Sequence, residues 1–192
     1  MAQKDKIKWN NKYKDNPVLL EQRDPSGKLI KCVEINKEKN KALDIACGTG
    51  RNSIYLANNN YKVDALDISD IVIEHLDNMN IKNIRAQVVD LEDINIKEYE
   101  YDLIVVCNYL DRKLFPKLIN ALNKNGLLLI ETYMNHESNT KSSFNPKFLL
   151  EKDELKNLIN DKVELIEYDE FDNESYEIHR MKKQSIILRR KV

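Results

Sequence analysis

The sequence predicts an α/β fold, namely a doubly wound, mostly parallel sheet of seven strands that ends in an antiparallel pair. Short apolar runs alternate with helical patterns between residues 41 and 133, and the connections between them are short. Such alternation is typical of a parallel sheet with helices on both faces. Two further apolar runs follow near the C-terminus with no helical pattern between them, which indicates an antiparallel pair.

The expected strands are defined by apolar runs. The first of them, 41–47, is short and stops at a glycine-containing turn, which suits a buried parallel strand better than a half-exposed one. The later strands are expected at 62–67, 84–91, 101–109, 127–133, 163–168 and 184–189.

The expected helices lie between these strands, at 51–57, 69–78, 113–123 and 151–160, and a helical arm is expected at 4–14. Pro116 falls in the first turn of its helix, where a missing N–H is tolerated. Asparagines 58–60 and Asn125 stand where glycine is usual, because Asn can adopt the left-handed conformation that ends a helix.

The length of 192 residues suits a single domain over 1–192, since ~100–200 residues per domain is typical. Within it we expect an N-terminal arm or lid over 1–40 and a cofactor-binding core over 41–135. The C-terminal helix and antiparallel strands would then occupy 136–192.

Composition excludes several classes of protein. With 42% hydrophobic and 33% charged residues the chain can build a core, which excludes intrinsic disorder. No apolar run approaches the ~20 residues that span a bilayer, and the N-terminus lacks the apolar stretch of a secretory signal. Three widely spaced cysteines provide neither a disulfide framework nor a paired zinc motif. We therefore expect a cytoplasmic protein without membrane association or a bound metal.

Glycine is scarce, and two of the four glycines, Gly48 and Gly50, lie in the turn after the first expected strand. This turn leads into a helix N-terminus, whose free N–H groups and small residues let a ligand approach the backbone. The crevice of an open parallel sheet lies beyond the carboxyl ends of its strands. The turn therefore predicts a nucleotide-type ligand, although an ordinary strand-to-helix turn is the alternative.

Acidic residues around the turn indicate which nucleotide would bind. Asp67 ends the second strand about 20 residues after the turn, as the ribose-binding acid of nucleotide folds does. Asp90 ends the third strand and could accept a hydrogen bond from an adenine amine, or could simply cap a helix. Asp44 would repel a pyrophosphate, and Ser53 replaces the third glycine of the dinucleotide motif. The cationic groups of S-adenosylmethionine would instead gain ~1–4 kcal/mol from such a carboxylate.

These motifs resemble the class I S-adenosylmethionine-dependent methyltransferases, which have a Rossmann-like fold. The stretches 43–57 (LDIACGTGRNSIYLA), 63–69 (VDALDIS), 105–112 (VVCNYLDR) and 126–133 (GLLLIETY) are similar to the tellurite-resistance branch of that family. The resemblance covers residues 40–135. It implies that S-adenosyl-L-methionine is the cofactor, and the expected cofactor-binding residues are Asp44, Ala46, Cys47, Gly48, Thr49, Gly50, Asn52, Asp67, Ile68, Asp90, Leu91, Cys107 and Asn108.

Residue roles on the donor side follow from the same resemblance. Cys47, Gly48, Gly50 and Asn52 would line the methionine moiety, Asp67 the ribose, and Asp90 with Leu91 the adenine. Cys107 to Tyr109 would form the floor near the methyl group. Asp111 departs from the pattern, since the branch often has His there.

The residues that would bind the methyl acceptor are harder to predict. Methyl transfer can be catalysed by alignment of the reactants and exclusion of water, with little help from acids or bases. Candidate catalytic residues are Tyr109, Arg112 and Tyr133, and candidate substrate or lid residues are Trp9, Tyr13, Arg112 and His136. Each could equally be a pocket wall or a surface residue.

The expected function is methyl transfer to a small molecule, such as a metalloid oxyanion or a thiol. Nucleic acid is an unfavoured partner, because 31 basic and 32 acidic residues create no global attraction for phosphates. An RNA methyltransferase and a non-catalytic S-adenosylmethionine-binding module are the alternatives, with a nicotinamide dehydrogenase behind them. Cys107 lacks the prolines that accompany a base-modifying nucleophile, and is expected to be a pocket or core residue.

Overall fold

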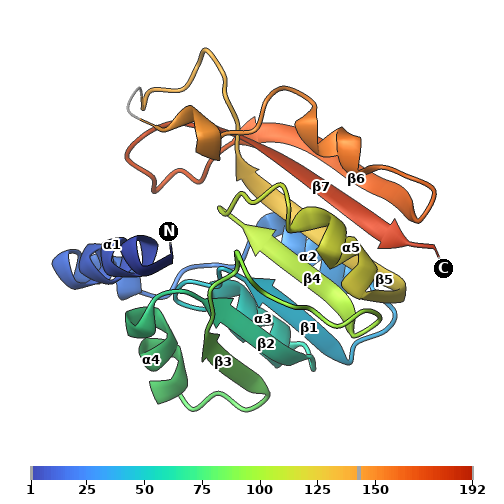
Figure 1. Ribbon diagram of the computed structural model, residues 1–192, viewed down its shortest axis with the longest axis horizontal. Helices are drawn as coiled ribbons and strands as arrows, with labels where there is room; N and C mark the ends of the chain where they lie inside the picture. The colour runs from blue at the N-terminus through green and yellow to red at the C-terminus, as the bar shows by residue number, and fades with distance from the viewer. Residues whose placement is uncertain (1, 142–143, 192) are drawn as a thin grey trace.

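The computed structural model describes residues 2–141 and 144–191 (Figure 1). Its sheet has seven strands in the order β3-β2-β1-β4-β5-β7-β6. The strands are β1 (Lys41–Ile45), β2 (Lys62–Asp67), β3 (Ile84–Val88), β4 (Tyr101–Cys107), β5 (Leu122–Tyr133), β6 (Val163–Asp172) and β7 (Lys182–Arg190). Strands β1 to β5 pair parallel, whereas β7 pairs antiparallel with both β5 and β6. The predicted fold class is confirmed.

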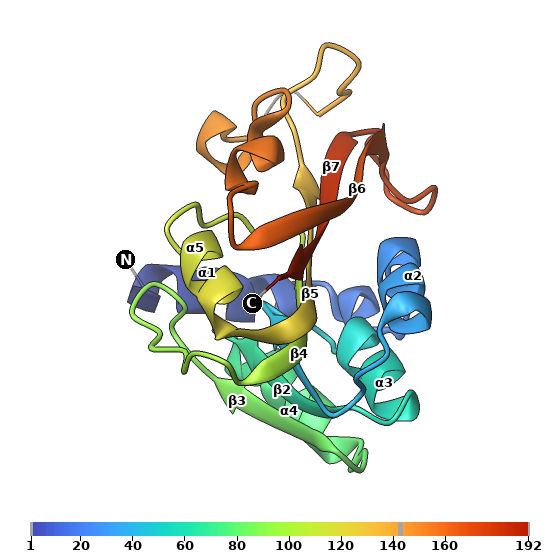
Figure 2. The same ribbon diagram turned by 90° about the vertical axis from the view of Figure 1, so that its right-hand side faces the viewer.

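Helices cover both faces of the sheet (Figure 2). They are α1 (Ala2–Asp15), α2 (Gly27–Ile35), α3 (Arg51–Asn58), α4 (Asp70–Asn78) and α5 (Phe115–Ala121), with 3-10 turns η1 (Pro17–Leu20), η2 (Pro146–Phe148) and η3 (Glu154–Leu158). Helices α2, α3 and α4 pack on one face and α5 on the other. None of the helices within the described residues has the length and apolar character to cross a membrane.

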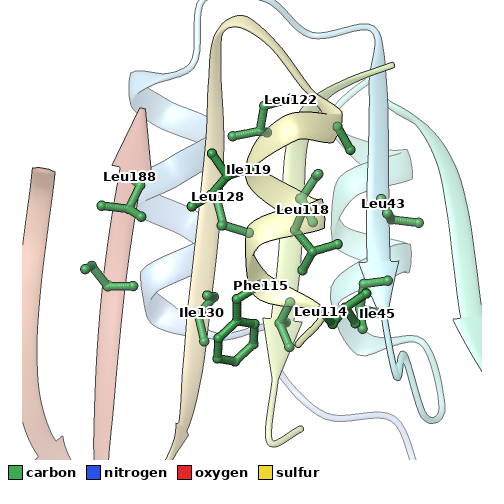
Figure 3. Packing of buried hydrophobic residues seen from close by; sticks show 14 of the residues in the cluster. Leu43, Ile45, Leu114, Phe115, Leu118, Ile119, Leu122, Leu128, Ile130 and Leu188 are labelled. Carbon is green, nitrogen blue, oxygen red and sulfur yellow. The ribbon is translucent and has the colours of Figure 1, made fainter. Parts of the chain in front are cut away.

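The core divides into two layers, one on each side of the sheet. Under α5, Leu118 packs against the inward side chains of β1 and β5, such as Leu43 and Leu128 (Figure 3). Under α2 and α3, Leu29 and Leu56 pack on the opposite face of the same strands. Each fully buried leucine contributes roughly 1.5–3 kcal/mol of transfer free energy. These two layers fix the strands, so that the carboxyl ends of β1, β2 and β4 meet at one edge.

Two helices differ from expectation. Helix α2 was not predicted, yet Ser26 caps it by accepting a hydrogen bond from the Lys28 amide, and Leu29 and Cys32 are fully buried beneath it. The α-helix expected at 151–160 is wrong, because only the 3-10 turn η3 forms there. Asp153 adopts a φ of 60°, a left-handed conformation that prevents a continuous α-helix from residue 151.

Asparagine does take the place of glycine at two of the expected positions. Asn60 has a φ of 71° and Asn125 a φ of 64°, whereas Asn58 is the last residue of α3. Strand β3 ends three residues earlier than expected, at Val88, and β4 ends two residues earlier, at Cys107. Asp90 and Tyr109 consequently lie in the loops beyond those strands.

Candidate functional site

The turn between β1 and α3 is unusually strained. Ala46, Gly48 and Gly50 all have positive φ angles, of 53°, 54° and 81°. A Cβ atom on Gly50 would lie 2.6 Å from Cδ1 of Leu76, so glycine is required there for packing as well as for backbone conformation. A Cβ on Gly48 would meet the Tyr13 hydroxyl of α1, at 3.5 Å, and, its chain neighbours aside, no other described side chain or backbone atom within 4 Å.

Asp67 links the end of β2 to this turn. Its Oδ2 accepts a hydrogen bond from the Gly48 amide (3.0 Å), and its Oδ1 accepts one from the Ser69 amide (2.9 Å). Burial raises the pKa of Asp67, while these backbone donors oppose that shift. A carboxylate oxygen has two lone pairs, so both oxygens keep acceptor capacity for a ligand hydroxyl. Ile68, half-buried, separates Asp67 from Ser69.

Asp44 lies deeper in the sheet, with 1% of its surface exposed. Its Oδ2 accepts a hydrogen bond from the Ser53 hydroxyl at 2.6 Å. Burial raises the pKa of Asp44 to about 7. A nearby cation would therefore stabilise the ionised form of Asp44, which burial alone disfavours.

The neighbouring residues of the turn are held by long-range contacts. Asn52 is buried, and its Oδ1 accepts a hydrogen bond from the Ser26 amide (3.0 Å) at the start of α2. The Thr49 carbonyl accepts a hydrogen bond from the Gln22 side chain at 3.3 Å. The segment between α1 and α2 is thereby tied to the turn.

Two cysteines flank the crevice. Burial raises the pKa of both Cys47 and Cys107 well above the usual value for a thiol. A protonated thiol is a weak nucleophile, which argues against covalent catalysis by either residue. Asn108, next to Cys107, has a φ of 57° and donates its amide hydrogen to the Glu131 carbonyl.

The adenine side of the predicted site is less structured. The Asp90 Oδ1 accepts a hydrogen bond from the Glu92 amide at 3.0 Å, which forms a local turn. Leu91 is 5% exposed and belongs to the core layer under α5. The structure thus places Asp90 near the surface and Leu91 inside.

Helix α1 lies over the carboxyl ends of β1 and β2. The Ser69 hydroxyl donates to the Asn10 side chain (2.6 Å), and Lys6 forms an ion pair with Asp70 (2.8 Å). Trp9 and Tyr13 have ring centroids 6.1 Å apart on this helix. Tyr13 covers the turn at Gly48, whereas the Trp9 ring contacts Tyr13 and the ammonium groups of Lys8 and Lys12.

The family model for "Tellurite resistance protein TehB" matches residues 4–191 of the chain. The chain belongs to the TehB family. It is 33% identical over 140 residues to a TehB of Haemophilus influenzae named as a probable S-adenosyl-L-methionine-dependent methyltransferase. That match covers 68% of this chain and 48% of the relative, so the chain spans about half the length of its curated relative.

Solved structures agree with the TehB assignment. The crystal structure of TehB from H. influenzae matches with a TM-score of 0.76 and 26% identity, covering 87% of this chain and 63% of that one. An S-adenosylmethionine-dependent methyltransferase from Methanosarcina mazei matches with a TM-score of 0.69 over 88% of this chain and 100% of that one. At 15% identity, the second likeness supports the fold alone.

In this TehB-family chain, the Arg112 side chain is engaged by contacts within the chain. Its guanidinium forms an ion pair with Glu154 through Nε (2.6 Å) and Nη2 (2.9 Å). Its Nη1 and Nη2 also donate to the carbonyls of Lys147 and Leu149. All three nitrogens are engaged, which argues against a contact with an anionic substrate and assigns Arg112 to fixing the segment between η2 and η3.

The other predicted acceptor-side residues are scattered. The Tyr133 hydroxyl donates to the Glu177 carboxylate (2.8 Å to Oε2), and burial together with this carboxylate raises the pKa of Tyr133. Tyr109 is half-buried, and burial raises its pKa as well. His136 is exposed and bonds only locally to Ser138. Of these residues, Tyr133 has the most extensive contacts with other segments.

A buried charged group on β5 and β7 is absent from the sequence prediction. Lys183 is 0% exposed, and its Nζ lies 3.2 Å from Glu131 and 2.6 Å from Glu174. The Ser26 hydroxyl donates to the other oxygen of Glu131 at 2.6 Å. The sequence signal for this group was a charged residue in each of two strands, Glu131 in β5 and Lys183 in β7. No cluster suited to a metal ion occurs within 2–141 and 144–191.

Proposed function

We propose that this chain is an S-adenosyl-L-methionine-dependent methyltransferase that acts on a small-molecule acceptor by in-line displacement. The observation that carries the proposal is the link between Gly48 and Asp67, above which Tyr13 closes and behind which Asp44 lies buried. The family membership and the named activity of the H. influenzae relative support the same assignment.

The residues present fit the donor. Gly48 leaves room for a ligand against its backbone, and Asp67 would accept hydrogen bonds from the ribose hydroxyls. Asp44 would offset the charge of the ammonium or sulfonium group, directly or through water. Cys47 and Asn52 would line the methionine moiety, and Asp90 and Leu91 the adenine.

When bound, the donor supplies an electrophilic methyl group on a sulfonium ion. The protein's part is to hold an acceptor in line with that group and to keep water out. Residues Cys107, Asn108 and Tyr109 would form the floor of this space. Glu177 accepts a hydrogen bond from the Tyr133 hydroxyl and would be available to take a proton from an acceptor.

The proposed acceptors are soft nucleophiles, namely a metalloid oxyanion or a thiol. The near balance of 31 basic and 32 acidic residues weighs against RNA as the acceptor. A cytoplasmic site of action is part of the proposal, because Cys32, Cys47 and Cys107 are all free thiols, as a reducing compartment maintains them.

Two measurements test the proposal. Titration calorimetry should show binding of S-adenosylmethionine and S-adenosylhomocysteine but not of NAD, and preferential binding of NAD would reject it. Donor consumption should then be seen with tellurite, selenite or a small thiol. Turnover on tRNA or rRNA alone would favour the RNA methyltransferase, whereas donor binding without turnover across the panel would favour a non-catalytic module.

A further inference from the structure

The carboxylate of Glu174 lies between the side chains of Arg51 and Lys183, close to the turn at residues 46–50, which we call the donor turn because it would hold the methyl donor. Glu174, in the loop 173–181 that joins β6 to β7, is held by Arg51 and Lys183. Its Oε1 accepts hydrogen bonds from both terminal nitrogens of Arg51 (3.2 Å each), and its Oε2 accepts one from the Lys183 Nζ at 2.6 Å. We call Arg51 and Lys183 the carboxylate clamp.

The clamp joins the turn after β1 to the end of β5. Arg51 directly follows Gly50 of that turn, and Lys183 pairs in register with Tyr133 at the carboxyl end of β5. Side chains of the clamp are little exposed, at 13% for Arg51 and 0% for Lys183. The two cations therefore lie between the turn that would hold the methyl donor and the carboxyl end of β5.

A buried hydroxyl group that has no hydrogen-bond partner within the described chain lies two residues from Lys183 on β7. Ser185 is 1% exposed, and its Oγ has no hydrogen-bond partner among the described residues. It is in register with Glu131 on β5, so it lies on the same face of the sheet as Glu131 and Lys183. A buried hydroxyl without a partner is costly, and a ligand that bonds to it would remove that cost.

The loop 173–181 is held at its base and at its tip by different sets of contacts. Its base is tied by Asn173, whose amide donates to the Met181 carbonyl and whose Oδ1 accepts from the Met181 amide. Its tip is exposed, with Ile178 at 95% and Tyr176 at 51%. The contacts that hold the tip down are mainly polar, since Glu174 meets the clamp and Glu177 meets Tyr133.

Charge explains why the clamp needs an anion. Glu131 opposes Lys183 from β5, whereas Glu174 belongs to the loop, so displacement of the loop removes the carboxylate that pairs with both Arg51 and Lys183. Burial alone would raise the pKa of Glu174, but Lys183 and Arg51 hold it at about 2. Glu174 is thus ionised throughout the physiological range and competes with any external anion.

We propose that the Arg51–Lys183 clamp binds a carboxylate group of the methyl acceptor, and that Glu174 fills the clamp until the acceptor displaces it. This inference rests on the proposed methyltransferase function and specifies its substrate class. The internal occupant is a planar carboxylate with each oxygen on a different cation, which favours a carboxylate over other anions.

The corresponding reaction can be written for mercaptoacetate, a thiol that carries a carboxylate. Its sulfur forms a bond to the methyl carbon while the bond between that carbon and the donor sulfur breaks. The electron pair of the broken bond returns to the donor, which becomes the neutral thioether S-adenosylhomocysteine. The thiol proton is released to solvent, and S-methylmercaptoacetate is the product.

The test compares mercaptoacetate with the neutral thiol 2-mercaptoethanol. We expect kcat/KM for mercaptoacetate to be about tenfold higher in the wild-type chain, because two charge-assisted contacts are made only by the carboxylate. Relative to the wild-type chain, the E174Q variant should lower KM for mercaptoacetate by a factor of about 3 to 10. The same variant should leave KM for 2-mercaptoethanol unchanged. The matched control is D172N, which removes a carboxylate from the same hairpin that pairs with Lys182 instead of the clamp.

A second readout is independent of methyl transfer. Succinate should increase hydrogen exchange of the amides in 173–181 in the donor-free protein, whereas ethylene glycol should not. Equal kcat/KM values for the two thiols, equal effects of E174Q and D172N, or a larger increase of exchange in 173–181 with selenite than with succinate would each overturn the inference. Failure to bind S-adenosylmethionine would instead reject the proposed function, and the exchange experiment would still decide whether the clamp takes a carboxylate. If E174Q does not fold, the wild-type comparisons remain decisive.

Discussion

The backbone amide of Gly48 donates a hydrogen bond to the carboxylate of Asp67 over 3.0 Å. This contact joins the turn after β1 to the end of β2, so the two segments expected to hold the donor are parts of one unit. A residue on either side therefore affects both the shape of the turn and the affinity for the ligand.

Asp67→Ala should weaken binding of S-adenosylhomocysteine by about 10- to 100-fold, which corresponds to roughly 1.4–2.8 kcal/mol. The substitution removes the acceptor for the ribose and also frees the Gly48 amide. Titration calorimetry at pH 8 measures the change. Asp93→Asn, at an exposed position, serves as the control and should bind normally; an unchanged affinity in Asp67→Ala would contradict the ribose role.

Gly50→Ala should destabilise the fold by about 2–4 kcal/mol. The added methyl group would clash with the buried side chain of Leu76 and would sit on a backbone with a φ of 81°. Urea unfolding gives the free energy. Gly27→Ala is the matched control, since its Cβ would meet nothing within 4 Å and we expect a change within about 0.5 kcal/mol. Similar losses in both variants would show that the strain at Gly50 is unimportant.

The affinity for S-adenosylhomocysteine should rise as the pH increases through about 7. Burial raises the pKa of Asp44 to about 7, and a bound cation favours the ionised form of this residue. Below that pH the affinity should fall by up to about tenfold per unit. Calorimetry with S-adenosylhomocysteine between pH 5.5 and 8.5 follows this change. Ser53→Ala removes a donor to the carboxylate and should move the midpoint upward.

The same shift has an opposite consequence for the stability of the ligand-free protein. Asp44 has a higher pKa in the native chain than when unfolded, so the native state binds more protons between about pH 4 and 7. The contribution of Asp44 to stability therefore falls as pH rises through this window. A pH-independent affinity in the wild-type chain would remove Asp44 from the donor site.

Arg112→Lys should lower the free energy of unfolding by about 1 kcal/mol and leave KM for the acceptor unchanged. Lysine cannot reproduce the paired contacts to Glu154 or reach both carbonyls at once. Thermal unfolding and acceptor titration separate the two effects. Lys113→Ala, at the adjacent exposed position, is the control; a large rise in KM for Arg112→Lys alone would restore its predicted role at the substrate.

The sheet could be predicted because its signals are local. Apolar runs and the Gly48–Gly50 turn are continuous in sequence, and the alternation of these runs with helical patterns indicated a mostly parallel sheet. Helix α2 follows Pro25-Ser26-Gly27, a sequence that is also typical of a turn. The capping serine and the spacing of Leu29, Cys32 and Val33 were nevertheless signals of a helix.

The cofactor-binding residues expected from the sequence come mainly from neighbouring segments. Residues 44–52 and Asp67 come from consecutive elements. The clamp residues Arg51 and Lys183 and their partner Glu174 instead come from distant parts of the chain. Such a pairing depends on β7 lying next to β5, which no local pattern specifies. Arg112 shows a second effect of distant segments. Its guanidinium could have bound an anionic substrate, but Glu154 from a distant segment forms an ion pair with it.

The placement of β7 between β5 and β6 also bears on synthesis. Strand β5 ends at Tyr133 and pairs with β4 on one side and with β7 on the other. Strand β7 is complete only at Arg190, about 60 residues later. At ~5–20 residues per second, the ribosome would leave the apolar edge of β5 unpaired for roughly 3–12 seconds. During this interval the edge is a template for pairing with other nascent chains. Slow translation of 134–190 should therefore lower the soluble yield, and chaperones that shield strand edges should restore it.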